Sequence, residues 1–83
     1  NISGIKVVDQ SAAIYLNELA LEFSCNWLKP NGHLLVKSFI GADFDSFVNS
    51  VKPFFKKVLR IKPSSSRDRS SEIFVLGYEK LNT

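Results

Sequence analysis

The connection between the last two apolar segments constrains the fold of this chain most strongly. Residues 56–62 alternate apolar and charged side chains, and residues 72–79 are mainly apolar, so both segments predict strands. Lysines in the first of them are typical of a sheet edge. About nine residues, 63–71, join the two. Because a parallel connection needs a crossover of a dozen or more residues, the final strand is expected to run antiparallel to its neighbours.

A long helix is predicted near the start of the chain. Between Asp9 or Ser11, each of which suits an N-cap, and Leu28, apolar residues recur at helical spacing. Because one stripe carries the large side chains, Phe23 and Trp27 are predicted to be buried in the core. The whole stripe consists of Leu16, Ala20, Phe23 and Trp27.

A short strand and a second helix are predicted after the turn Pro30-Asn31-Gly32. Residues 33–39 lack clean alternation, which predicts a strand covered on both faces. Residues 44–55 return to helical spacing, with Asp43 as the expected N-cap and Pro53 ending or kinking the helix. We expect one right-handed parallel crossover unit, formed by the first strand, this helix and the second strand.

Composition excludes several classes of protein. The 83 residues, 45% hydrophobic and 23% charged, suit one small globular domain or a piece of a larger one. A single cysteine, Cys25, allows no internal disulfide, and a single histidine, His33, leaves too few parts for a zinc site or a serine–histidine triad. No apolar run approaches the ~20 residues of a membrane span. The net charge of +3 permits a polyanionic partner without requiring one.

Two ionisable residues stand at the ends of predicted core strands. Lys37 interrupts the apolar run 34–39, and Glu72 opens the last strand. Because burying a lysine without a partner is costly, we expect Lys37 to lie beside a counter-ion. An antiparallel last strand would bring Glu72 to the same rim of the sheet. An ordinary ion pair at a strand end is the alternative reading.

The polar loop before Glu72 is basic and rich in serine. Arg67 and Arg69 suit phosphate contacts and Ser70 a further hydrogen bond, which would position RNA without reading its bases. A solvated turn explains the same residues. The preceding strand adds four cations that either extend this surface or protect the sheet edge, namely Lys56, Lys57, Arg60 and Lys62.

Three stretches of this sequence resemble the carboxyl-terminal half of the FtsJ-like (RrmJ) family of S-adenosylmethionine-dependent RNA 2′-O-methyltransferases. Residues 1–4, Asn-Ile-Ser-Gly, resemble the tail of a motif. Residues 32–39 resemble the strand with the family's central catalytic lysine, and residues 62–74 the loop and strand with its catalytic glutamate. Phe74 departs from the family, which often has a tyrosine there, so any role of that hydroxyl is lost.

The resemblance implies an α/β fold, the carboxyl-terminal half of a Rossmann-like methyltransferase fold with three strands, the last antiparallel, and two main helices. Residues 1–83 would form part of a single domain whose S-adenosylmethionine-binding half is absent. The family places a lysine, an aspartate, a lysine and a glutamate around the ribose hydroxyl, and only the last two have counterparts here, Lys37 and Glu72. The chain alone is therefore expected to be inactive.

The function implied for the parent protein is (uridine-2′-O-)methylation of large-subunit ribosomal RNA in the cytoplasm, with ribosomal RNA or the large subunit as partner. In the parent protein Lys37 would be the base or the group that steers the hydroxyl, with Glu72 as its electrostatic partner. Lysine acts as a base only when neutral, which near pH 7 costs roughly 4–5 kcal/mol, so in the isolated chain we expect Lys37 to be the protonated partner of Glu72. The rival function is a non-catalytic RNA-binding module built on the basic loop 62–71. A fragment without activity that self-associates through its exposed sheet edge is a third reading.

Overall fold

The computed structural model describes residues 10–66 and 70–82. The predicted order of helix, strand, helix, strand, strand is confirmed, while the predicted N-cap Asp9 and the motif at residues 1–4 lie outside the described residues. In chain order the elements are α1 (Gln10–Trp27), β1 (Leu34–Phe39), α2 (Phe44–Val51), the 3₁₀ turn η1 (Lys52–Phe54), β2 (Phe55–Ile61), the 3₁₀ turn η2 (Ser64–Ser66) and β3 (Glu72–Lys80).

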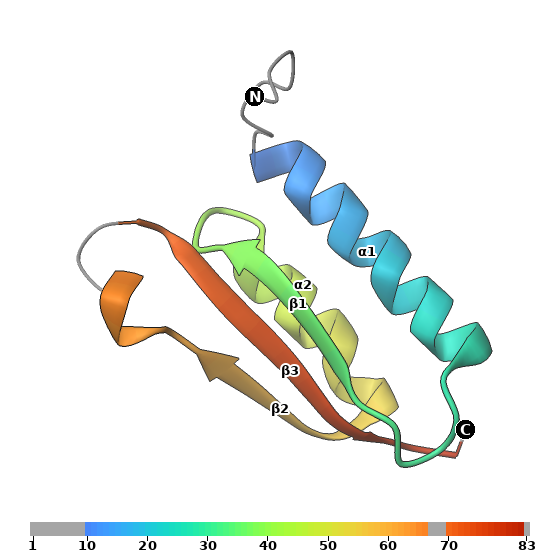
Figure 1. The fold of residues 1–83 in the computed structure, drawn as a ribbon. Coiled ribbons are helices and arrows are strands. Elements are labelled where there is room, and N and C mark those ends of the chain that lie inside the picture. The colour runs from blue at the N-terminus through green and yellow to red at the C-terminus, as the bar shows by residue number, and fades with distance from the viewer. Residues whose placement is uncertain (1–9, 67–69, 83) are drawn as a thin grey trace, which may run out of the picture.

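The three strands form one sheet in which β3 lies between β1 and β2 (Figure 1). Both outer strands pair antiparallel with β3, as the short connection predicts, so β1 and β2 run in the same direction without touching. Phe74 of β3 lies opposite Lys37 of β1 and Ile61 of β2, and Glu72 lies opposite Phe39. The end of β1 therefore meets the start of β3.

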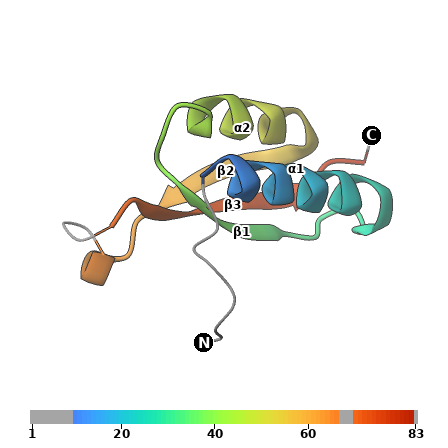
Figure 2. The ribbon, with the colours of Figure 1, turned by 90° about the horizontal axis from the view of Figure 1, so that it is seen from above.

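Both helices lie on the same side of the sheet, with α1 alongside β1 (Figure 2). The core fills the space between them and the sheet, and α2 supplies half of the buried core cluster because its spacing directs one face inward. No helix of the described residues covers the opposite face of the sheet. The buried core cluster consists of Leu21, Phe44, Phe47, Val48, Val51, Phe55, Ile73 and Val75.

The prediction that Phe23 and Trp27 are core residues is wrong. They are 65% and 73% exposed, and the stripe that faces the sheet lies one residue further along α1, about 100° around the helix. This stripe contains small and polar side chains, which let α1 approach the sheet closely. Its most buried members are Ala13, Asn17, Leu21 and Ser24.

The prediction that β1 is covered on both faces is also wrong. Leu35 is 59% exposed, while Ser38 on the other face is fully buried. Leu34 and Val36 pack against the helices with Ser38, so their face belongs to the core. Leu35 and Phe39 on the open face are also apolar, so the sequence does not show the alternation between a buried and an open face.

The turns lie where proline and glycine predict them. α1 ends at Trp27, and Asn31 adopts a positive φ of 71° in the following turn. α2 ends at Val51 before Pro53, and Asp43 precedes it without a side-chain capping hydrogen bond. Ser11, an expected N-cap, lies inside α1. Within residues 10–66 and 70–82, neither α1 nor α2 combines the length and the hydropathy of a membrane-spanning helix.

Replacing Phe47 with alanine should lower the free energy of unfolding by ~3–5 kcal/mol, because this 1%-exposed ring fills the core and truncation leaves a cavity. The matched control is Phe23→Ala in α1, where the same truncation at an exposed position should change stability by about 0.5 kcal/mol or less. Urea unfolding of the chain measures both values. Equal losses for the two variants would contradict this assignment of the core.

Candidate functional site

Lys37 and Glu72 meet on the open face of the sheet. Lys37 Nζ lies 3.6 Å from Glu72 Oε2, and the two side chains are 50% and 41% exposed. Glu72 pairs with Phe39, two residues beyond Lys37, so both side chains project from the same face. The expected convergence of these groups is confirmed. The expected burial of Lys37 is wrong, because its face of the sheet is open among the described residues.

The segment leading into β3 fixes the position of Glu72. The Glu72 N–H donates to Ser70 Oγ at 3.3 Å, and the Lys62 ammonium donates to the carbonyls of Ser70, at 2.6 Å, and of Glu72. Ser70, a predicted RNA contact, therefore already has a role within the chain. The predicted RNA contacts Arg67 and Arg69 lie outside the described residues.

The cations of β2 also have partners within the chain. Lys56 Nζ lies 3.6 Å from Glu79 Oε1, and Arg60 Nη2 lies 3.3 Å from Asp45 Oδ1. The Lys57 ammonium lies 5.9 Å from the centre of the Tyr78 ring. These contacts favour the interpretation that the cations of β2 protect the sheet edge, because each of them already has an interaction partner within the chain.

A small cavity separates Lys37 from α1. It has a volume of about 250 Å³ and is lined by Ala13, Leu16, Asn17, Lys37 and Phe39. Asn17 is only 7% exposed, and its Nδ2 has no hydrogen-bond partner among the described residues. A buried donor without a partner is costly, so this atom marks a place where an acceptor would be stabilised. Sequence reasoning missed Asn17, although an amide within a buried helical stripe is itself a signal.

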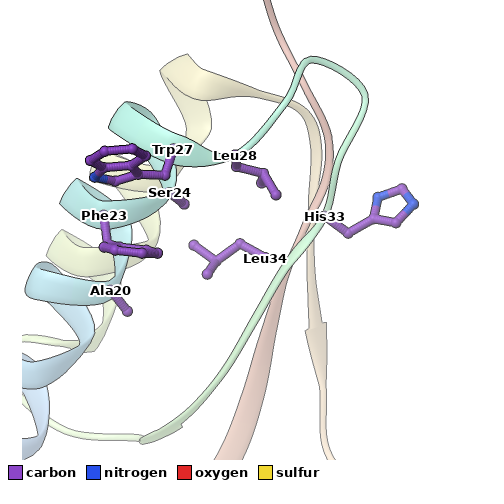
Figure 3. Close-up of a pocket in the computed structure, with 7 residues that line it drawn as sticks. All are labelled: Ala20, Phe23, Ser24, Trp27, Leu28, His33 and Leu34. Atoms are coloured by element: carbon purple, nitrogen blue, oxygen red, sulfur yellow. The ribbon is translucent and has the colours of Figure 1, made fainter.

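A larger apolar hollow lies at the other end of α1 (Figure 3). Its volume is about 340 Å³, and its lining consists of Ala20, Phe23, Ser24, Trp27, Leu28, His33 and Leu34. The His33 ring points away from it, stacks on Tyr78 at 4.8 Å and accepts the Glu79 N–H through Nδ1. Among the residues that line it, none has a titratable group aimed into the hollow, which adjoins the start of β1, away from Lys37.

The described residues hold neither a metal centre nor a recognisable site for a methyl donor. No three of their His, Cys, Asp and Glu side chains are grouped as metal ligands would be. The two glycines in close contact serve packing, because a Cβ at Gly32 would lie 2.7 Å from Leu28 and a Cβ at Gly77 would lie 2.9 Å from Phe55. A glycine-rich cradle for a nucleotide-like cofactor is therefore not formed by the described part of this chain.

The chain is similar to bacterial RNA-modifying enzymes. Residues 1–80 match the family described as FtsJ-like methyltransferase. The ribosomal RNA large subunit methyltransferase E of Methylobacillus flagellatus is 56% identical over 82 residues, which is 99% of this chain and 40% of that protein. The protein of the same name from Chromobacterium violaceum is 49% identical over 93% of this chain and 38% of its own length. The chain thus spans about two fifths of the relatives it matches.

The Lys37–Glu72 pair should contribute little to stability, because both groups are half exposed and solvent screens them. A double-mutant cycle with Lys37→Met and Glu72→Gln should give a coupling of ~0.2–1 kcal/mol that shrinks as salt is added. The matched control is the Lys56–Glu79 pair, which has the same 3.6 Å separation. A coupling of several kcal/mol, measured by urea unfolding, would show that the pair is primarily structural.

Proposed function

The chain belongs to the FtsJ-like methyltransferase family, and from that premise we propose that it is the carboxyl-terminal part of an S-adenosylmethionine-dependent (uridine-2′-O-)methyltransferase acting on large-subunit ribosomal RNA. The observation that carries the proposal is the 3.6 Å contact of Lys37 with Glu72, where the end of β1 meets the start of β3. Two such groups, remote in the chain and joined on an open surface, suit a site that a substrate can reach.

Lys37 acts in this proposal as the group that steers the ribose hydroxyl. An ammonium paired with a carboxylate donates hydrogen bonds and cannot abstract a proton, so the paired state favours orientation of the oxygen over general-base action. Glu72 sets the direction of the ammonium. Orientation of a weak nucleophile is worth several orders of magnitude in rate when the geometry is fixed, and here β1 and β3 provide that geometry.

The proposal assigns the methyl-donor site and most of the RNA contacts to residues outside the described part of the chain. The methyl donor supplies the transferred methyl group when bound, and its binding site is assigned to the part of the parent protein that this chain does not span. Arg67, Arg69 and Ser70 are proposed to contact phosphates of the RNA. A cytoplasmic location fits an enzyme that meets ribosomal RNA, and the isolated chain is expected to be inactive.

Replacing Lys37 with alanine in the full-length enzyme should lower kcat by at least ~10²-fold, because the hydroxyl loses the group that orients it. Binding of the methyl donor should be unchanged. Single-turnover methyl transfer to ribosomal RNA, with donor binding measured by calorimetry, tests both statements.

The matched control for this experiment is Lys52→Ala, which removes a lysine of η1 from a position away from the pair. It should leave kcat unchanged. Full turnover by Lys37→Ala would remove Lys37 from the mechanism. If RNA affinity alone fell as salt rose, with no transfer by the unmodified enzyme, the non-catalytic RNA-binding alternative would be favoured.

The chain by itself is proposed to self-associate through the free edge of β1. Leu35, Leu76 and Leu59 form one row across the open face, and β1 is paired on one side only among the described residues. Such an edge with exposed apolar neighbours favours pairing with another chain.

Leu35→Lys should therefore weaken self-association, because a lysine beside a free edge disfavours further pairing. Leu59→Lys is the matched control, since it places the same substitution in the same row but on the lysine-bearing strand β2. Size-exclusion chromatography with light scattering over a range of concentrations measures the effect. A monomer at every concentration would contradict self-association, and equal effects of both variants would contradict the β1 edge.

A further inference from the structure

Lys62 follows β2 directly and reaches across the connection to β3. Its ammonium donates to the carbonyl oxygen of Ser70 at 2.6 Å and to the carbonyl oxygen of Glu72. The side chain is partly buried, so its charge is not simply displayed to solvent. Two of the three donors of the ammonium are thus directed to the backbone just where β3 begins.

These contacts stand where the β2–β3 ladder stops. The last pair of that ladder is Ile61 with Phe74, so Glu72 lies beyond it on the β2 side. The ladder with β1 does reach Glu72, through its pairing with Phe39. The Lys62 side chain therefore donates hydrogen bonds to the start of β3 at a point that the backbone of β2 no longer reaches.

Glu72 is consequently held at three points. Its N–H donates to Ser70 Oγ, its carbonyl accepts from Lys62, and its carboxylate lies 3.6 Å from the ammonium of Lys37. On the opposite side, the N–H of Ile40 donates to the Ser71 carbonyl at 2.8 Å. The backbone around Glu72 is fastened from both neighbouring strands, which fixes where its carboxylate can lie.

We infer that Lys62 is a positioning residue, whose ammonium holds the start of β3 so that the Glu72 carboxylate faces Lys37. Two of its three donors are committed to carbonyl oxygens, so Lys62 is assigned to this role and not to phosphate binding. Lysine suits the task because a compact ammonium on a flexible stem can reach two carbonyls that are not arranged for a planar guanidinium. The consequence for methyl transfer rests on the proposed function, whereas the structural role of Lys62 does not.

The test compares Lys62→Met and Lys62→Arg with Lys52→Met in the full-length protein. Lys62→Met keeps most of the stem and removes the donors, Lys62→Arg keeps charge and donors, and Lys52→Met controls for the loss of one positive charge. Amide hydrogen exchange at Glu72 and the nuclear Overhauser contact between the side chains of Lys37 and Glu72 report the geometry. The kcat and KM for ribosomal RNA report the consequence.

Lys62→Met should speed exchange at Glu72 at least tenfold, weaken the Lys37–Glu72 contact and lower kcat at least tenfold, with KM for RNA unchanged. Lys62→Arg should recover part of each loss, and Lys52→Met should change none of them. An intact contact in Lys62→Met, or a raised KM with unchanged kcat, would overturn the inference and assign Lys62 to RNA binding.

If the unmodified protein transfers no methyl group, the proposed function fails, while exchange and the side-chain contact still decide the role of Lys62. Should Lys62→Met not fold, Lys62→Arg alone decides: a weakened Lys37–Glu72 contact with a lowered kcat and an unchanged KM supports the role, and a wild-type contact with a wild-type kcat overturns it.

Discussion

The central place of β3 is the constraint on which the rest of this structure depends. Both other strands pair with β3, so the sheet exists only when this last segment lies between them. Hydrogen bonds hold the end of β3 as well as its start. Lys80 exchanges backbone hydrogen bonds with the Asn31–Gly32 turn, at 2.8 Å each, and the Leu81 N–H donates to Phe54 at 2.9 Å. Gly77 lets the Phe55 ring lie against the β3 backbone, which a Cβ would prevent.

Local signals in the sequence were sufficient for the order of elements and for the convergence of the charged pair. Proline and glycine marked the turns, and the length of the 63–71 connection dictated an antiparallel β3. Once β3 is antiparallel, Glu72 lies at the same rim of the sheet as the end of β1, near Lys37. The shared rim follows from the length of the connection and the strand direction, whereas the direct contact also depends on β3 lying between β1 and β2.

The packing of α1 could not be deduced in the same way. Helical spacing shows that apolar residues recur, but α1 has two adjacent stripes, one with Phe23 and Trp27 and one with Ala13, Leu21 and Ser24. The large side chains of the first stripe led to the prediction that it is buried. The second stripe is the buried one, because its smaller side chains let the helix approach the sheet closely. The roles of the cations were hidden for a related reason. Whether Lys62 meets a phosphate or a carbonyl depends on a partner eight to ten residues away, and composition does not reveal it.

The open surfaces and the candidate site are neighbours in this structure, and that proximity links stability to chemistry. Lys37 lines the same cavity as the exposed Leu16 and as Asn17, whose buried Nδ2 has no hydrogen-bond partner among the described residues, and Lys37 lies on the same open face as Leu35. A segment that covered Leu16 and Leu35 would at the same time place its own polar groups near the half-exposed Lys37. On the proposed function, the part of the protein that completes the core is therefore also the part that completes the constellation around the ribose hydroxyl. In that proposal, burial of apolar surface would supply the free energy for docking, while the half-exposed Lys37–Glu72 pair, expected to add little to stability, would be available for the substrate.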